Sequence, residues 1–205
     1  MEPVNTAILP MSPLDFVNHC PELVDIYWIA MDLDAQGLGG HSRQGRVRQW
    51  RSLVHNPGFK AVCSVSDGQI TGIAYGMNGE PGKNWTRAIA DGLARSGGVD
   101  PRWPEMLADY YEVSELHVLP EMQGRGIGRK LLTALLEDAP QSWALLSTPE
   151  VPHEANRAFS LYRSLGFTDV IRHFTFFADP RLFAVLAAEL PLRNTERVIP
   201  PRSSR

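Results

Sequence analysis

The stretch ELHVLPEMQGRGIGR, residues 115–129, decides the fold of this chain. It joins a strand-like segment to an amphipathic helix through a turn in which Gly124, Gly126 and Gly128 occupy alternate positions. Glycine permits positive φ and a close approach of the backbone to a ligand. Because the turn opens directly into a helix, free N–H groups and the positive end of the helix dipole converge there. The stretch therefore predicts an anion site that would suit a pyrophosphate.

Two better-known phosphate-binding motifs do not fit this turn. A Walker loop requires Gly-Lys-Ser/Thr, which is absent. A Rossmann fingerprint requires GxGxxG after a first strand, but here the third glycine comes one residue early and the motif lies late in the chain. The remaining pattern is QxxGxG or a close variant of it, read here as Gln123-Gly124-Arg125-Gly126-Ile127-Gly128.

With a second block downstream, the motif resembles the GNAT N-acetyltransferase superfamily. The second block is Asn156-Arg157-Ala158, Leu161-Tyr162 and Leu165-Gly166-Phe167. Two blocks at this separation are more specific than either alone, and the strong resemblance covers residues 110–167. The resemblance implies an α/β (α+β) fold, with a mixed, mostly antiparallel twisted sheet and flanking helices. It also implies a splay between the two central strands, expected at residues 110–118 and 143–147.

The resemblance implies acetyl-CoA as co-substrate, with no metal. Backbone N–H groups of the turn would hold its pyrophosphate. The backbone of the strand before the turn would pair with the pantetheine arm and polarise the thioester carbonyl, and Asn156 would touch the pantetheine or acetyl region. The cofactor-binding residues implied in this way are Leu116, His117, Val118, Gln123, Gly124, Arg125, Gly126, Ile127, Gly128, Arg129 and Asn156.

Acetyl transfer needs a neutral amine, and only roughly one lysine-like amine in 10³ is neutral at pH 7. A carboxylate can remove the proton, directly or through water. Glu112 and Glu115 lie on the strand beside the expected thioester, and strict alternation places them on opposite faces. The family often has its base at the position of Glu112, so Glu112 is the first candidate and Glu115 the second. A solvated or paired strand carboxylate without a catalytic role is the remaining interpretation.

The departing thiolate takes up a proton, and the resemblance implies that Tyr162 supplies it. A phenol with a pKa of about 10 is a weaker acid than a thiol with a pKa of about 8.5, so a proton shared in the transition state is expected. The alternative is a core tyrosine on the helical stripe formed with Leu161 and Leu165. His117 is expected to be a structural histidine on the side of Glu115.

One domain is expected over residues 1–193, because 205 residues with 43% hydrophobic content can bury a sizeable core. Residues 79–109 form an expected insertion that carries a helix and is a candidate lid, and residues 194–205 an expected flexible tail. Pro21 predicts a helix that starts near that residue, after an irregular lead-in from residue 14. Asp67-Gly68 predicts a β-hairpin. Residues 183–190 fit a helix or a strand, and the strand is favoured as the hairpin partner of residues 168–177.

Composition argues against several classes of protein. The net charge of -3 gives no basic footprint for nucleic acid. No apolar run approaches the roughly 18 residues of a membrane helix, and the first ten residues lack the pattern of a signal peptide. The two cysteines, Cys20 and Cys63, lie far apart and outside any metal-binding motif. The sequence therefore predicts a cytoplasmic protein without nucleic-acid or membrane partners.

The expected function is transfer of the acetyl group of acetyl-CoA to a primary amine, by direct attack without a covalent enzyme intermediate. A small-molecule amine is favoured, because an insertion near the acceptor side favours a closed pocket. One alternative is acetylation of a protein N-terminus or lysine. Another is a non-catalytic acyl-CoA-binding sensor module, against which Tyr162 and the strand glutamates argue. A homodimer is expected only by analogy with the family.

Overall fold

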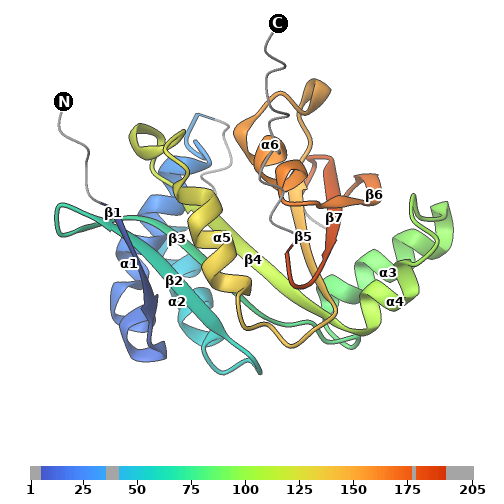
Figure 1. The fold of residues 1–205 in the computed structure, drawn as a ribbon, viewed down its shortest axis with the longest axis horizontal. Coiled ribbons are helices and arrows are strands. Elements are labelled where there is room, and N and C mark those ends of the chain that lie inside the picture. Colours follow the sequence, from blue (N-terminus) through green and yellow to red (C-terminus); the bar gives the residue numbers. More distant parts are fainter. Residues whose placement is uncertain (1–5, 36–41, 177–178, 193–205) are drawn as a thin grey trace, which may run out of the picture.

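A seven-stranded sheet in the order β1-β2-β3-β4-β5-β7-β6 forms the centre of the molecule (Figure 1). The computed structural model describes residues 6–35, 42–176 and 179–192. Neighbouring strands are antiparallel except β4 and β5, which are parallel. The expected mixed, mostly antiparallel α/β fold is therefore confirmed. The strands are β1 (Thr6–Met11), β2 (Lys60–Ser66), β3 (Gln69–Asn78), β4 (Tyr110–Val118), β5 (Trp143–Pro149), β6 (Thr168–Phe174) and β7 (Phe183–Glu189).

Helices cover both faces of the sheet. Along β2, Ala61 and Cys63 pack in an apolar cluster with α1, whereas Val62 packs in another cluster with α5 and α6. Alternation along the strand therefore separates two cores. None of the helices in the described ranges is both long and apolar enough to cross a membrane. The helices are α1 (Pro13–Ala30), α2 (Arg43–Leu53), α3 (Asn84–Ser96), α4 (Trp103–Ala108), α5 (Ile127–Leu136) and α6 (Arg157–Ser164), with short 3₁₀ turns η1 (Pro120–Met122) and η2 (Pro152–Glu154).

Helix α1 runs without interruption through Pro21, so the expected helix start near Pro21 is wrong. A capping box starts the helix earlier, because the Ser12 Oγ accepts from the Asp15 N–H at 3.1 Å and the Asp15 carboxylate accepts from the Ser12 N–H. Pro21 lacks the N–H that would donate to the Val17 carbonyl. The Arg51 Nε of α2 donates to that carbonyl instead, at 3.1 Å. A neighbouring helix thus supplies the missing donor.

The hairpin and the last strand form as expected. Asp67 and Gly68 have φ of 51° and 76°, as a two-residue hairpin turn with two positive φ angles requires. Residues 183–189 form β7, which lies between β5 and β6, so the favoured strand is confirmed. The segment 194–205, expected to be a flexible tail, lies outside the described residues.

The segment 79–109 carries two helices, α3 and α4, rather than one. Their buried residues Ile89, Leu93, Met106 and Leu107 form a third apolar cluster with β5, β6 and β7. Figure 1 shows both helices beside that half of the sheet, away from α1 and α2. This part of the chain is packed as core, and its role as a lid stays a prediction, as does the single domain over residues 1–193.

Strands β4 and β5 pair over only three residues and then separate. The pairing ends at Glu112, which lies opposite Leu145. β4 continues to Val118 and stays paired with β3 on its other side. Within the described chain its side toward β5 has no strand partner from Val113 onward, and Figure 1 shows the two strands diverging. The expected splay is confirmed, and it leaves backbone donors and acceptors of β4 available to a ligand.

Candidate active site

The glycine turn after β4 forms an anion-binding site from backbone N–H groups. Gly124 and Gly126 both have φ of +77°, a conformation that other residues rarely adopt. Gly126 is the N-cap of α5, and Lys130 donates to its carbonyl at 3.1 Å. For the N–H groups of residues 124–129, the described part of the chain provides no acceptor. These groups lie at the positive end of the helix and suit a pyrophosphate.

Three side chains of the turn hold it in place. The Gln123 Nε2 donates to the Val118 carbonyl at 2.9 Å, which closes the turn onto the end of β4. The Arg129 Nη2 donates to the Ser164 Oγ at 2.6 Å and so links α5 to α6. The exposed Arg125 donates to the Glu121 carbonyl at 3.2 Å. The turn therefore presents its backbone to a ligand while these side chains fix its shape.

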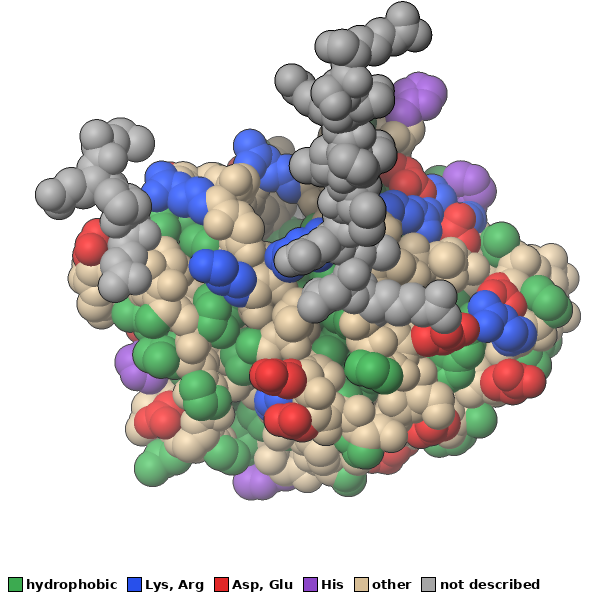
Figure 2. Space-filling model, in the orientation of Figure 1, with side chains coloured by type: hydrophobic (Ala, Val, Ile, Leu, Met, Phe, Trp, Pro, Cys, Tyr) green, Lys and Arg blue, Asp and Glu red, His purple; other side chains and the backbone are tan. Residues whose placement is uncertain are grey.

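Arg157, the first residue of α6, reaches the same turn from the opposite side. Its Nη1 lies 2.2 Å from where a Cβ on Gly124 would be, so this close approach depends on glycine. A guanidinium beside a row of N–H groups strengthens anion binding. The sequence expectations omitted Arg157, although the block Asn156-Arg157-Ala158 contains it. Figure 2 shows Lys and Arg side chains along the upper edge, where Figure 1 places the start of α5 and of α6.

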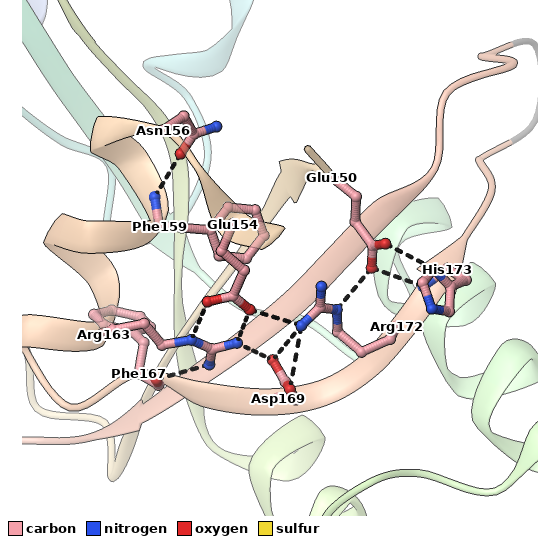
Figure 3. Close-up of polar contacts among 9 residues, drawn as sticks. All are labelled: Glu150, Glu154, Asn156, Phe159, Arg163, Phe167, Asp169, Arg172 and His173. Carbon is pink, nitrogen blue, oxygen red and sulfur yellow. Dashed lines mark hydrogen bonds and ion pairs between the residues drawn. The ribbon is translucent and has the colours of Figure 1, made fainter. Parts of the chain in front are cut away.

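Asn156 is the N-cap of α6. Its Oδ1 accepts from the Phe159 N–H at 2.8 Å, as Figure 3 shows. Within the described ranges its Nδ2 donates to no acceptor, so this amide group can still bind a ligand carbonyl. The capping bond fixes the direction of the Asn156 side chain at the start of α6.

An ion-pair network holds the loop that leads to Asn156. Glu154 pairs with both Arg163 of α6 and Arg172 of β6, and the Arg172 Nε lies 2.7 Å from the Glu150 Oε1. The Arg163 guanidinium keeps the pKa of Glu154 below its ordinary value. These contacts tie the loop between β5 and α6 to helix α6 and to strand β6. Figure 3 shows the network, which consists of Glu150, Glu154, Arg163, Asp169, Arg172 and His173.

A β-bulge at Ser114 puts Glu112 and Glu115 on the same face of β4. The register against β3 shifts there, so that Glu115 lies opposite Tyr75 and Glu112 lies opposite Met77. Directly opposed residues share a face, and Tyr75 and Met77 both lie in the cluster beneath α1. The expectation that the two glutamates face opposite ways is wrong, because the extra residue in β4 resets the alternation.

Strict alternation along β4 would put Leu116 and Val118 on the face of Glu112, but the bulge prevents this. Both pack on the other face of the sheet, in the cluster that contains α5. Their backbone still belongs to the unpaired side of β4. The bulge thus separates the carboxylates from the apolar side chains while keeping the backbone of 116–118 at the splay.

Glu112 is half-buried where β4 and β5 part. The Ser114 Oγ donates to its Oε1 at 3.0 Å. Burial raises the pKa of Glu112, and the Ser114 hydrogen bond and the charge of Lys83 oppose this shift only in part. A carboxylate with a raised pKa binds a proton more tightly than an ordinary one, which suits a general base.

Glu115 is held by the buried His117, whose Nε2 lies 2.6 Å from the Glu115 Oε2. The His117 ring also meets Tyr27 of α1 edge-on, with ring centroids 5.0 Å apart. His117 is therefore a partnered histidine on the side of Glu115, as expected.

Tyr162 of α6 is buried, and its ring packs against Phe167 with centroids 5.7 Å apart. Its hydroxyl forms no hydrogen bond with another described residue. Burial raises the pKa of Tyr162, and the negative charge of Glu115 adds to the shift, so the phenol is protonated at neutral pH.

Comparison with known sequences gives consistent matches. Residues 84–169 match the family model described as an acetyltransferase (GNAT) domain. The chain is 45% identical to a GCN5-like protein acetyltransferase of Mycobacterium tuberculosis over 207 aligned positions, which cover 90% of this chain and 98% of that protein. It is 47% identical over 60 residues to the N-alpha-acetyltransferase RimI of the same organism, which is 29% of this chain and 36% of RimI.

Solved structures share the fold over nearly the whole chain. The putative acetyltransferase yncA of Salmonella typhimurium, determined with acetyl-CoA, has a TM-score of 0.60 at 18% identity, covering 92% of this chain and 96% of that one. The ribosomal-protein-S18-alanine N-acetyltransferase of Escherichia coli has a TM-score of 0.57 at 14% identity, covering 94% and 98%. At these identities the likeness is one of fold.

Proposed function

This chain belongs to the GNAT acetyltransferase family, and from that premise we propose that it transfers the acetyl group of acetyl-CoA to a primary amine on a protein. Acetyl-CoA-dependent N-acetyl transfer follows from the family. The observation that carries the protein acceptor is the relative that matches almost the full chain, which is a protein acetyltransferase. A lysine side chain is the commonest such amine.

A small-molecule amine was favoured from the sequence because residues 79–109 could narrow the acceptor side. In the structure, α3 and α4 bury their apolar residues against β5, β6 and β7. The segment is thus accounted for as core and gives no separate support for a closed pocket. The protein amine is therefore the better-supported acceptor, and small amines belong in the test.

The residues of the splay fit acetyl-CoA. In this proposal the N–H groups of residues 124–129 and the Arg157 guanidinium bind the pyrophosphate. The backbone groups of Leu116 and Val118 on the unpaired side of β4 pair with the pantetheine arm, apart from the Val118 carbonyl held by Gln123, and the Asn156 Nδ2 binds a carbonyl of that arm. Support comes from the unmatched donors of the turn and from the unpaired side of β4.

Direct attack needs a base on one side of the splay and an acid on the other. Glu112 takes the proton of the acceptor ammonium, so that the nitrogen lone pair can form the new C–N bond. A backbone N–H near Val118 stabilises the negative charge on the carbonyl oxygen. The C–S bond then breaks, Tyr162 gives its proton to the departing sulfur, and the second proton of the new amide nitrogen restores the tyrosine. Glu115, held by His117, stays on the acceptor side as the second candidate for the base.

Release of free thiol from acetyl-CoA tests the acceptor class. The panel pairs lysine peptides and peptides with a free N-terminus against polyamines, free amino acids and aminoglycosides, and mass spectrometry locates the acetyl group. We expect turnover with peptides. Turnover of small amines alone would overturn the protein acceptor, and tight acetyl-CoA binding without any turnover would support the sensor module instead.

A further inference from the structure

A row of contacts leads outward from the candidate base region along the face under α1 and α2. It starts at Glu115, which pairs with His117, and continues through Tyr27. The Arg46 Nη2 of α2 then donates to the Tyr27 hydroxyl at 3.3 Å, and the guanidinium lies 5.1 Å from the centre of the Tyr27 ring. The row therefore has a carboxylate at its inner end and a guanidinium at its outer end.

Among the contacting arginines of α2, Arg43 is paired with a carboxylate, whereas Arg46 and Arg51 have only neutral partners in the described ranges. The Arg43 Nη1 lies 2.8 Å from the Asp25 Oδ1, and Arg51 donates to a backbone carbonyl. Besides Tyr27, Arg46 donates to the Gln49 Oε1 at 3.1 Å, and no carboxylate of the described ranges lies within 4.0 Å of it. The Arg46 guanidinium therefore keeps an uncompensated positive charge.

The Arg46 side chain is half-buried and reachable from solvent. It lines a hollow of about 340 Å³ at the start of α2 together with Ser42, Gly45 and Gln49. A guanidinium at such a hollow can accept a carboxylate in two parallel hydrogen bonds.

Arg46 and Glu115 act on the same hydroxyl. Burial raises the pKa of Tyr27, Glu115 raises it further, and Arg46 opposes the shift. Arg181 also faces Tyr27, but its Nη2 is paired with the Asp179 Oδ2 at 2.7 Å. Among these groups, Glu115 offers negative charge to an amine and Arg46 offers positive charge to an acid.

We propose that Arg46 binds a carboxylate next to the acceptor amine, so that the enzyme selects lysines with an aspartate or glutamate nearby in the chain. The three contacts between Arg46 and Glu115 span a distance that a few residues of extended chain, at about 3.3 Å each, can cover. This inference rests on the proposed protein acceptor and names its substrate class. A free amino acid also carries an amine and a carboxylate, and it forms a separate arm of the test.

The experiment compares two sets of lysine peptides that differ only in acidic or basic residues within three positions of the lysine. kcat and KM are measured for wild type, Arg46→Gln and Arg46→Glu. We expect wild type to favour the acidic set by roughly tenfold in kcat/KM, from one charge-assisted contact. Arg46→Gln should lose this preference through KM, and Arg46→Glu should reverse it toward the basic set.

Arg48→Gln is the matched control, because Arg48 is exposed on the same helix and forms no hydrogen bond, ion pair or ring contact with another described residue. It should behave as wild type, and the KM for acetyl-CoA should be equal in all variants. A reversed preference needs a folded enzyme, so loss of structure cannot imitate it.

Equal turnover of both peptide sets by wild type would overturn this inference and leave the protein acceptor standing. A preference for the acidic set that survives in Arg46→Glu would also overturn the role of Arg46. Turnover of free amino acids alone would overturn the protein acceptor and this inference together.

Discussion

Two carboxylates share one face of β4 but are held differently. Glu112 receives a hydroxyl hydrogen bond from Ser114, whereas Glu115 is paired with His117. Burial raises the pKa of Glu112, so Glu112 loses its proton at a higher pH than an ordinary glutamate. A base works only when it is ionised, and the acidic limb of the pH–rate profile is therefore the property that reports on it.

Glu112→Gln should lower kcat/KM at pH 7 by about 10²–10³-fold, because a positioned base contributes that much. In wild type, kcat/KM should rise with pH through the pKa of Glu112, which lies above the ordinary value of 4.5. This limb should be absent in Glu112→Gln. Glu115→Gln is the control, and it should keep the limb. A limb that disappears in Glu115→Gln and survives in Glu112→Gln would assign the base to Glu115.

Tyr162→Phe should lower kcat by roughly 10–100-fold with little change in the KM for acetyl-CoA, since a proton donor acts in the transition state. The melting temperature should stay close to that of wild type, because the hydroxyl has no hydrogen bond to another described residue. Burial raises the pKa of Tyr162, so no loss of activity from its ionisation is expected up to about pH 10. Full activity of the variant would remove Tyr162 from the mechanism.

At the scale of single elements, α1 depends on a donor from α2. Arg51→Met leaves the Val17 carbonyl without the Nε donor and should lower the free energy of unfolding by about 1 kcal/mol. In a Pro21→Ala background the new N–H of residue 21 can donate to the Val17 carbonyl. Arg51→Met should then lower the free energy of unfolding by much less than about 1 kcal/mol. Urea unfolding of the four proteins measures this coupling. An equal cost of Arg51→Met in both backgrounds would show that the contact carries no stability.

The glycine turn allows a comparison of three glycines with nearly equal φ. Gly124→Ala, Gly126→Ala and Gly68→Ala all place a Cβ at φ of +76° to +77° and should each cost roughly 1 kcal/mol of stability. Gly124→Ala alone would also displace the Arg157 guanidinium. We expect the KM for acetyl-CoA to rise most for Gly124→Ala and to stay unchanged for Gly68→Ala in the distant hairpin. Equal KM values in all three would separate the turn from acetyl-CoA binding.

The elements that the sequence predicted correctly are those with local signals. Asp67-Gly68 is itself the turn of the hairpin, and the alternate glycines themselves shape the start of α5. The wrong helix start in α1 and the wrong assignment of faces on β4 both have their cause in distant partners. Pro21 is tolerated because of Arg51 on another helix, and the bulge at Ser114 exists only in the pairing of β4 with β3. No periodicity within one segment contains that information.

At the scale of the whole molecule, the prediction that β4 and β5 separate came from the family resemblance rather than from any pattern in the chain. The apolar residues of β4 and β5 mark both as strands, but they do not say where the pairing of the two strands stops. Arg46 shows the same limit, since its position beside Tyr27 depends on how α1 and α2 pack. The motif named most residues of the candidate site, but Arg157 and the distances between the residues required the fold.

The network around the loop from β5 to α6 should make stability depend on pH. Arg172→Met leaves Glu150, whose side chain is only 10% exposed, without its main cation and should cost about 2 kcal/mol at pH 7. In wild type, burial would raise the pKa of Glu150, but Arg172 and His173 outweigh burial and lower it. The stability that Glu150 contributes is therefore present above its ordinary pKa of 4.5 and is lost as pH falls through its lowered value.

The gap in unfolding free energy between wild type and Arg172→Met should consequently narrow between pH 7 and pH 4, because the abandoned Glu150 becomes protonated. Urea unfolding at the two pH values measures it. Arg87→Met on the exposed side of α3 is the control and should show a small gap at both. A gap that does not change with pH would mean that Arg172 stabilises by packing on Phe159, whose ring centre lies 5.5 Å from its guanidinium.

The separation of β4 from β5 affects how readily the protein aggregates when no co-substrate is bound. A strand with free backbone groups is a template on which another extended chain can add, and natural sheets usually confine such edges to their rim. Here the open edge lies in the middle of the sheet. A co-substrate arm lying along β4 would cap this template in the way a missing strand would. The protein would then aggregate more readily at low acetyl-CoA concentration, because the open edge of β4 would be uncovered.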